Sequence, residues 1–210
     1  MEIYKFDYNP IDDLVSNTYV LADSDLNCII IDPGKGNNKL IDFINRHNLK
    51  PLAILLTHGH IDHIRGVDRL AKAFKVKTYI HYLDEEMIKD SELNLSNQLG
   101  EPLKVESDII TVLDNEELNL FKEKIIVIHT PFHTKGSVCY YLPEEKALFT
   151  GDTLFKQSIG RDDLPNNDKH QRAESLNKIK KLPSNITIYP GHGPNTTLES
   201  ELLNNHFLIY

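Results

Sequence analysis

The 210-residue sequence has no tryptophan, only two cysteines, and no hydrophobic run that approaches the length of a membrane-spanning helix. Its first residues, Met1–Lys5, lack the basic segment and apolar stretch of a secretory signal. We therefore expect a cytoplasmic protein without a membrane partner. Cys28 and Cys139 each lie inside an apolar run, which predicts buried, reduced thiols rather than a disulfide framework or a zinc finger.

Positive charge is also scarce, because 23 Lys and Arg residues face 31 Asp and Glu residues and the formal net charge is −8. Such a chain has no general attraction to nucleic-acid phosphates, so we expect a small-molecule substrate and no nucleic-acid partner. Hydrophobic residues make up 40% and charged residues 26%, as in ordinary globular proteins. The length and the absence of a linker predict a single domain over residues 1–210.

Short β-branched and aromatic runs alternate with helical spacings of apolar residues. The predicted strands are Tyr4–Tyr8, Thr18–Ala22, Cys28–Ile31, Leu52–Leu56, Val76–Ile80, Ile109–Leu113, Ile125–Ile128, Ser137–Leu142, Ala147–Thr150 and Thr187–Tyr189. The predicted helices are Asn38–Asn48, Ile64–Phe74, Leu83–Lys89, Ala173–Leu182 and Thr197–Asn205, the last started by a capping box of Thr196 and Glu199. We expect Ser91–Ser107 to be a long surface loop bordering a substrate cleft, and the four strands of 109–150 to form a meander.

Strands in two groups, each followed by helices, favour two sheets packed face to face with helices outside. The pattern also permits a three-layer α/β fold.

The stretch Thr57-His58-Gly59-His60-Ile61-Asp62-His63 lies between a predicted buried strand and an amphipathic helix, where loops commonly carry chemistry. Imidazole nitrogens and carboxylates are zinc ligands, so His58 and His60 predict one ion, while Asp62 and His63 can face another. A two-metal site needs further ligands, ideally with a carboxylate between ions about 3.5–4 Å apart. Three later turns supply the candidates His133, Asp152 and His192.

The order of these motifs resembles the metallo-β-lactamase superfamily and, more narrowly, its glyoxalase II-like (hydroxyacylglutathione hydrolase-like) branch. The similar segments span nearly the whole chain: Asn17–Tyr19, Ile31–Gly34, Thr57–His63, His133–Ser137, Gly151–Phe155, Ser158–Arg161 and Gly191–Gly193. The resemblance implies an α/β (α+β) fold, a four-layer αββα sandwich with the site at one edge of the two sheets. It also implies two divalent ions, with zinc expected and iron or manganese as alternatives.

By this resemblance His58, His60 and His133 hold the first metal, Asp62, His63 and His192 hold the second, and Asp152 bridges them. Phe132, Lys135 and Arg65 depart from the family pattern, and we expect Phe132 to narrow the mouth of the site. Asp32 either caps the next helix or lines the pocket. Five further histidines are interpreted as surface or core residues: His47, His81, His129, His170 and His206.

A water shared by two divalent ions has its pKa lowered toward neutrality, which supplies a hydroxide nucleophile for a metal-dependent hydrolase. The resemblance implies a thioester substrate, and Asp62 is expected both to ligate a metal and to orient the water. Arg161 is expected either to hold a substrate carboxylate or to form a surface salt bridge with Asp162 or Asp163. The sequence ends 18 residues after His192, without the helical region that contributes thiol contacts in full-length glyoxalase II enzymes, so glutathione is not predicted as the thiol.

Other functions on the same motifs stay open. One is a persulfide dioxygenase-like enzyme with a single iron held by two histidines and an aspartate. Others are a lactonase, a phosphodiesterase or nuclease, and a binding module without catalysis.

Overall fold

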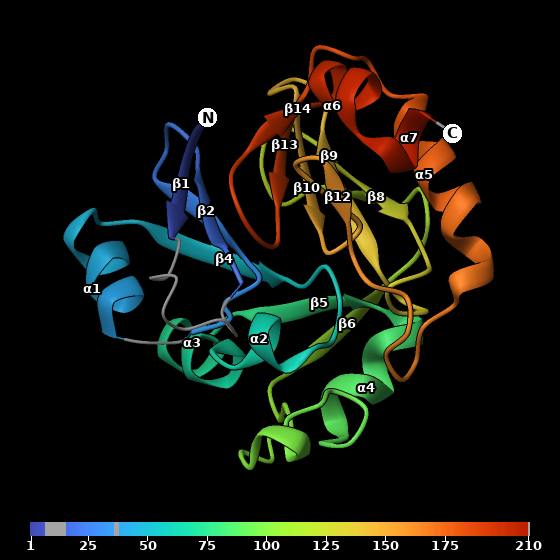
Figure 1. Cartoon of the computed structure of the whole chain (residues 1–210). Helices are drawn as coiled ribbons and strands as arrows, with labels where there is room; N and C mark the ends of the chain where they lie inside the picture. The colour runs from blue at the N-terminus through green and yellow to red at the C-terminus, as the bar shows by residue number, and fades with distance from the viewer. Residues whose placement is uncertain (7–15, 36–37, 210) are drawn as a thin grey trace. The chain divides into compact units, whose positions relative to one another are not determined.

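The computed structural model of the chain describes residues 1–6, 16–35 and 38–209 (Figure 1). These residues form two compact units, Met1–Thr111 and Val112–Tyr210, which we call the amino-terminal and carboxyl-terminal units. Each unit is associated with one six-stranded sheet. The sequence-based expectation of one domain stays a prediction.

The first sheet contains its strands in sequence order: β1 (Glu2–Phe6), β2 (Thr18–Ala22), β3 (Asn27–Ile31), β4 (Lys50–Leu55), β5 (Lys77–His81) and β6 (Ile109–Val112). The pairs β1–β2 and β2–β3 are antiparallel, whereas β3–β4 and β4–β5 are parallel. Parallel neighbours need a crossover connection. Helix α1 (Asn38–Arg46) provides it between β3 and β4, and α2 (Ile61–Ile64) with α3 (Val67–Phe74) provides it between β4 and β5.

The helices of this unit cover one face of the sheet. Apolar residues three and four positions apart on α1 and α3, such as Leu40 and Ile44 or Val67 and Leu70, pack in one core with alternate strand residues. Full burial of such a side chain contributes about 1.5–3 kcal/mol. The segment between β5 and β6 adds η1 (Tyr82–Asp84), α4 (Glu85–Lys89) and η2 (Asn97–Leu99).

The second sheet has the order β14-β13-β10-β9-β8-β7. Its strands are β7 (Glu117–Leu118), β8 (Ile125–His129), β9 (Val138–Leu142), β10 (Ala147–Gly151), β13 (Thr187–Pro190) and β14 (Thr196–Thr197). Strands β8, β9 and β10 form an antiparallel meander, and β13 joins β10 in parallel. A separate hairpin contains β11 (Leu154–Phe155) and β12 (Ser158–Ile159).

The remaining elements of the carboxyl-terminal unit are η3 (Lys169–Gln171) and the helices α5 (Arg172–Lys180), α6 (Leu198–Asn204) and α7 (His206–Ile209). Residues from all three α-helices, including Leu176, Leu198 and Leu208, share a core with the sheet residues Cys139 and Leu148. These helices therefore cover one face of the second sheet.

Several predicted boundaries and roles were wrong. Ile109–Leu113 does not join the meander, because its strand β6 lies beside β5 in the first sheet. The helix predicted over Ile64–Phe74 is divided, since the N–H of Gly66 donates to the carbonyl of Pro33 instead of continuing the helical pattern. Helix α6 is capped by Thr197, not Thr196, and the Thr197 hydroxyl oxygen accepts from the N–H of Ser200 at 3.2 Å.

The segment 91–107 is not simply a surface loop, because Asn94, Ser96 and Val105 are buried. The Asn94 amide donates to the carbonyl of Leu103, and the N–H of Leu103 donates to the Ser96 hydroxyl. These bonds satisfy polar groups that burial would otherwise penalise. The end of the first predicted strand, Asp7 and Tyr8, lies outside the described residues.

Across the stretches that the structure describes, no helix is both long enough and apolar enough to cross a bilayer.

Candidate metal centre

The seven predicted ligands all follow the carboxyl ends of strands, four in the amino-terminal unit and three in the other. In the second sheet, β8 and β10 run in one direction because each is antiparallel to β9, and β13 is parallel to β10. The turns that follow these three strands therefore leave the same edge of that sheet. Those turns carry His133, Asp152 and His192.

A buried carboxylate orients His63. Asp32 follows β3 with a positive φ of 47°, and its Oδ2 accepts a hydrogen bond from Nδ1 of His63 at 2.8 Å. Its Oδ1 accepts the backbone N–H of Thr57 at 2.8 Å. A carboxylate on Nδ1 fixes the ring orientation and the tautomer, which directs the unprotonated Nε2 toward a metal.

The same carboxylate acts on His58 through a hydroxyl. Thr57 Oγ1 donates to Asp32 Oδ2 at 2.6 Å and lies 3.1 Å from Nδ1 of His58. Because the Thr57 proton is directed to the carboxylate, its oxygen accepts from His58. Asp32 and Thr57 thus hold two predicted ligands, a role that the sequence analysis did not assign to Asp32.

The donor atoms of this turn lie close together. The ring centroids of His58 are 4.9 Å from those of His60 and 4.1 Å from those of His63. Candidate donor atoms lie within 4.8 Å of one another for the pairs His58 with His60, His58 with His63, and Asp62 with His63. Asp62 Oδ2 is 3.5 Å from His63 Nε2.

A close approach between two loops positions the backbone of Asp62. A Cβ added at Gly34 would lie 1.8 Å from the carbonyl oxygen of Asp62, so only glycine fits there. The same carbonyl accepts a hydrogen bond from the Ser16 hydroxyl at 2.7 Å. The absence of a side chain at Gly34, in the Asp-Pro-Gly sequence, therefore allows the backbone of Asp62 to lie where it does.

In the carboxyl-terminal unit, one oxygen of Asp152 faces two histidines. Oδ2 of Asp152 lies 3.5 Å from Nε2 of His133 and 3.5 Å from Nε2 of His192. Two ligands at about 2.0–2.1 Å from a tetrahedral zinc are separated by about 3.3 Å. Each of the two pairs, Asp152 with His133 and Asp152 with His192, therefore has the spacing and the donor types of two ligands on one ion.

The ring of His133 is held by a main-chain group that sequence reasoning missed. Its Nδ1 donates to the carbonyl oxygen of Arg161 at 2.8 Å. A Cβ on the adjacent Gly160 would lie 1.9 Å from the carbonyl oxygen of Asp152 and 3.2 Å from His133 Nδ1. The sequence indicated this segment only through the Ser158–Arg161 motif. It could not indicate the carbonyl group, because every residue has one.

The side chain of Arg161 forms a surface salt bridge with Asp163, one of the two roles expected for it. Its Nε and a terminal nitrogen donate to the two carboxylate oxygens of Asp163 at 2.6 and 2.9 Å, and both side chains are exposed. Hydrogen bonding from the guanidinium lowers the pKa of Asp163. A substrate role for Arg161 stays a prediction.

Phe132 does not narrow a site mouth, contrary to the prediction. It is fully buried in the core that Leu154 and Ile179 share. Although the family commonly has glycine at this position, the Phe132 ring packs in the interior beside the His133 turn and does not project into solvent.

The prediction of buried, free thiols is confirmed. Cys28 and Cys139 are both free and buried. Burial raises the pKa of Cys28 to about 12 and that of Cys139 to about 11.

The five remaining histidines are not among the predicted ligands. His129 donates through Nε2 to the carbonyl of Lys135 at 2.8 Å, and burial lowers its pKa. His81 is buried and its Nδ1 accepts from the N–H of Leu83. His47, His170 and His206 are exposed.

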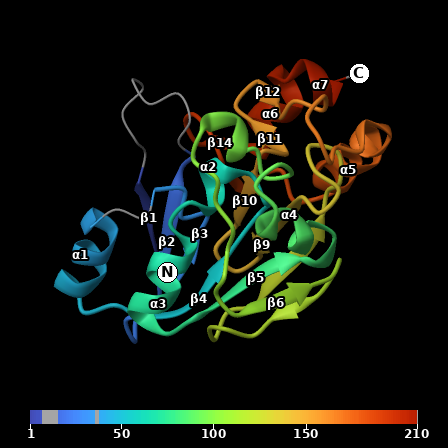
Figure 2. The same cartoon turned by 90° about the horizontal axis from the view of Figure 1, so that it is seen from below.

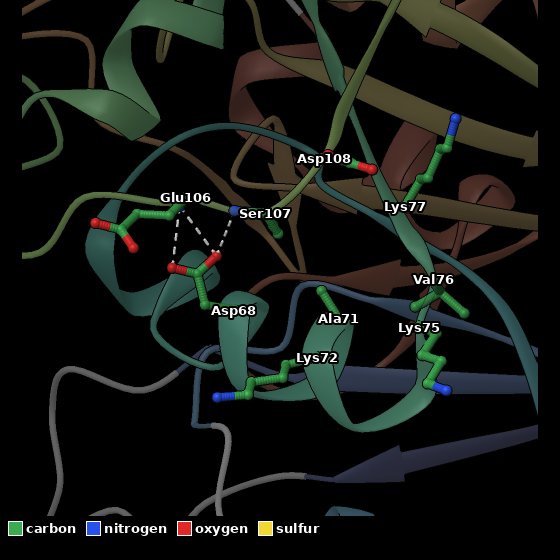
Figure 3. A pocket seen from close by; sticks show the side chains of 9 residues that line it. All are labelled: Asp68, Ala71, Lys72, Lys75, Val76, Lys77, Glu106, Ser107 and Asp108. Atoms are coloured by element: carbon green, nitrogen blue, oxygen red, sulfur yellow. Dashed lines mark hydrogen bonds between the residues drawn. The ribbon is translucent and has the colours of Figure 1, made fainter.

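A cavity of about 430 Å³ in the amino-terminal unit is a different feature (Figure 3). Figure 3 shows the Asp68 carboxylate accepting from the backbone N–H groups of Glu106 and Ser107. Lys77, which lines the cavity, begins β5, whereas the ligand turn follows the end of the parallel strand β4. The cavity therefore lies at the opposite end of the sheet from His58.

Residues 11–192 match the model of the metallo-β-lactamase superfamily. The chain belongs to this superfamily. The match extends over both units and includes all seven predicted ligands. The predicted fold is confirmed as the metallo-β-lactamase fold.

Two curated relatives cover almost the same length as this metallo-β-lactamase superfamily member. The "Probable metallo-hydrolase YqgX" of Bacillus subtilis is 34% identical, over 95% of each chain. The "Hydroxyacylglutathione hydrolase GloC" of Haemophilus influenzae is 32% identical, also over 95% of each chain.

Two solved structures are similar over the whole fold. The BLEG-1 B3 metallo-β-lactamase is 40% identical with a TM-score of 0.92, over 100% of both chains. TTHA1623 in a di-iron-bound form is 34% identical with a TM-score of 0.84, over 98% of this chain and 100% of the other.

Proposed function

We propose that the chain is a metallo-hydrolase that cleaves a thioester, with two divalent ions as cofactors. The ions would be held by the seven ligands in the sets expected above: His58, His60 and His133, then Asp62, His63 and His192, with Asp152 between them. A pair of divalent ions lowers the pKa of a coordinated water toward neutrality and so supplies the nucleophile.

The observation that carries this proposal is the position of Asp152 Oδ2, equidistant at 3.5 Å from His133 Nε2 and His192 Nε2. Hydrogen bonds at Nδ1 leave the ring of His133, and likewise that of His63, in the tautomer that metal binding requires. A structural polar network has no need for this arrangement. The three conditions together support a metal centre.

Asp62 is the proposed catalytic residue. Its side chain is 20% exposed, while the neighbouring His63 is fully buried. A carboxylate that solvent reaches can accept a hydrogen bond from water at Oδ and take up the proton as the carbonyl carbon is attacked. The Ser16 hydroxyl on its carbonyl keeps this residue in place.

The substrate class rests on the relatives. The similarity to a hydroxyacylglutathione hydrolase, which this chain matches over 95% of its length, supports a thioester of a 2-hydroxy acid and assignment to the glyoxalase II-like branch. The similarity to a di-iron protein supports iron beside zinc as the native metal. We propose a small-molecule substrate without a nucleic-acid or membrane partner, and a cytoplasmic location, which suits two free buried thiols.

A second candidate activity is β-lactam hydrolysis, because the BLEG-1 enzyme is 40% identical over all of both chains. Both reactions place a water-derived nucleophile on a carbonyl carbon. They differ in the leaving group, which is a thiolate for the thioester and an amine nitrogen for the lactam.

The test is a substrate panel on protein whose metal content has been measured. The panel contains a 2-hydroxyacyl glutathione thioester, a simple acyl thioester, a β-lactam, a lactone, a persulfide and a phosphodiester. We expect thioester cleavage to dominate and to fall by about 10²–10³-fold in Asp152→Ala, the scale of losing one preorganised group. Asp163→Ala, which removes an exposed carboxylate, is the matched control and should keep full activity.

Other outcomes reassign the function. Sulfite formation from the persulfide with one iron per chain and no thioester cleavage would replace the hydrolase with a dioxygenase. Faster cleavage of the β-lactam than of any thioester would favour the second candidate.

A further inference from the structure

The β11–β12 hairpin, together with Gly160 and Arg161 that follow it, contacts all three candidate ligands of the carboxyl-terminal unit. The Phe155 ring lies edge-on to His192 with centroids 5.9 Å apart. Gly160, directly after β12, packs against the backbone of Asp152, and the next carbonyl, that of Arg161, accepts from His133. A shift of this hairpin therefore changes the surroundings of His133, Asp152 and His192 together.

The other side of the hairpin is held by a buried carboxylate on α6. Glu201 has no exposed surface, and its Oε2 accepts the backbone N–H of Gln157 in the hairpin turn at 2.7 Å. Gln157 has a positive φ of 58°, a backbone conformation that needs support from its neighbours. The Thr196 hydroxyl donates to Oε1 of Glu201 at 2.7 Å.

Asn205, one turn later, completes the contact. Its Nδ2 donates to Glu201 Oε2 at 2.8 Å and lies 3.1 Å from the carbonyl of Ser158. Asn205 is also buried, and α7, which it precedes, contacts β12. Figure 2 shows the hairpin strands beside α6 and α7.

Glu201 accepts hydrogen bonds from the backbone N–H of Gln157, the side-chain amide of Asn205 and the Thr196 hydroxyl. A buried carboxylate is costly, and an apolar residue would fill the same position in a core that served packing alone. What the carboxylate provides here is a fixed acceptor for the hairpin turn.

We propose that Glu201 and Asn205 are positioning residues for the metal ligands of the carboxyl-terminal unit. They act through the hairpin, whose register sets the Arg161 carbonyl against His133 and the Phe155 ring against His192. This inference rests on the metal centre of the proposed function, but not on the substrate.

The test compares Glu201→Ala, Glu201→Gln and the control Glu199→Ala, an exposed carboxylate on the same helix. Each metal-free protein is titrated with cobalt(II) against a chromophoric chelator, and the visible ligand-field bands are recorded. We expect Glu201→Ala to weaken cobalt binding by about 10–100-fold, as loss of support around metal ligands does, and to change the bands. Glu201→Gln should restore binding to within about threefold, because its amide oxygen can accept from Gln157 and its NH₂ can donate to the Thr196 hydroxyl.

Asn205→Ala is the second variant. It keeps the Glu201 carboxylate, so the proposal can still be tested if Glu201→Ala does not fold. It should weaken cobalt binding by about tenfold. A melting temperature that falls in Glu201→Ala and Asn205→Ala while affinity and bands stay those of the wild type would overturn the proposal, since the pair would then be only structural.

The two proposals fail in different ways. Wild-type protein that binds two cobalt ions but cleaves no thioester contradicts the proposed function, and the positioning role is still decided by the affinities of the variants. Wild-type protein that binds no cobalt overturns both.

Discussion

Nδ1 of His63 lies 2.8 Å from Oδ2 of Asp32, a carboxylate 31 positions earlier in the chain and 2% exposed. That same oxygen also accepts the Thr57 hydroxyl, whose oxygen faces His58. One buried carboxylate thus orients two predicted ligands. We expect its loss to lower metal affinity more than it lowers the stability of the fold.

We predict that Asp32→Asn weakens zinc binding by about 10–100-fold, the usual effect of removing a carboxylate that supports a ligating histidine. The amide has one acceptor oxygen for three donors, so the ring of His63 loses its fixed tautomer. Competition with a chromophoric chelator measures the affinity. Asp25→Asn, at an exposed position, is the control, and equal affinities for the two variants would refute the role of Asp32.

Thr57→Val should reproduce part of this loss, because valine keeps the shape but removes the hydroxyl between Asp32 and His58. Leaving a buried acceptor without its partner costs about 1–3 kcal/mol. Urea unfolding and zinc affinity should both decline for Thr57→Val. Thr57→Ser retains the hydroxyl and should behave almost as the wild type; a serine variant as weak as the valine variant would show that packing, not the hydrogen bond, matters.

Gly160→Ala should damage both stability and metal binding, because the new Cβ would lie 1.9 Å from the carbonyl oxygen of Asp152. Overpacking of this kind costs about 1–3 kcal/mol. Gly100→Ala is the matched control, since a Cβ there meets nothing within 4 Å and only the positive φ of 72° is strained. Thermal melts and zinc stoichiometry separate the two, and a loss of metal in Gly100→Ala alone would contradict this account.

The two thiols should be unreactive in the native protein. Burial raises the pKa of Cys28 to about 12 and that of Cys139 to about 11, so the thiolate is rare at pH 8. A disulfide reagent such as dithionitrobenzoate should label neither cysteine until urea unfolds the chain, and then both. Rapid labelling of one thiol under native conditions would show that its core opens.

The ion pair of Asp114 and Lys178 should make stability depend on acid pH. Burial alone would raise the pKa of Asp114, but the N–H of His129 and the ammonium of Lys178 lower it overall. A folded-state pKa below the unfolded value contributes stability above the unfolded pKa, and this is lost as the pH falls through the folded pKa.

Lys178→Met should therefore lower the free energy of unfolding by up to about 1 kcal/mol at pH 7, with a smaller difference from wild type below pH 3. Urea titrations at the two pH values measure it. Lys124→Met, which removes an exposed partner of Glu117, is the comparison and should have little effect at either pH. A difference that does not change with pH would show that Asp114 is not the titrating group.

Much of the fold could be predicted from local patterns. Thr18–Ala22 forms a strand with the predicted bounds, and the ends of most other predicted elements lie within two residues of those in the structure. Periodicity succeeds there because each element buries a face whose spacing is written into the sequence. It could not place Ile109–Val112, since a short apolar strand suits either sheet and only the pairing with β5 decides.

The candidate site shows the same division. A motif such as His58-Gly59-His60 indicates metal binding by residue type and spacing, so candidate ligands could be proposed from the sequence. The groups that orient them include the Arg161 carbonyl, and a carbonyl is present at every position of the chain. Its selection depends on where Gly160 lets two backbones approach, which is a property of packing.

By itself, the sequence determined the residue types of the candidate ligands, the order of the turns that carry them, and the family, because residue types and their spacing can be read directly along the chain. The tertiary structure alone decided that Asp32 and Thr57 hold His63 and His58, that the Arg161 main chain holds His133, and that Glu201 reaches the hairpin turn at Gln157. These are hydrogen bonds between residues far apart in the chain, and their partners are chosen by how the cores pack rather than by any neighbouring residue.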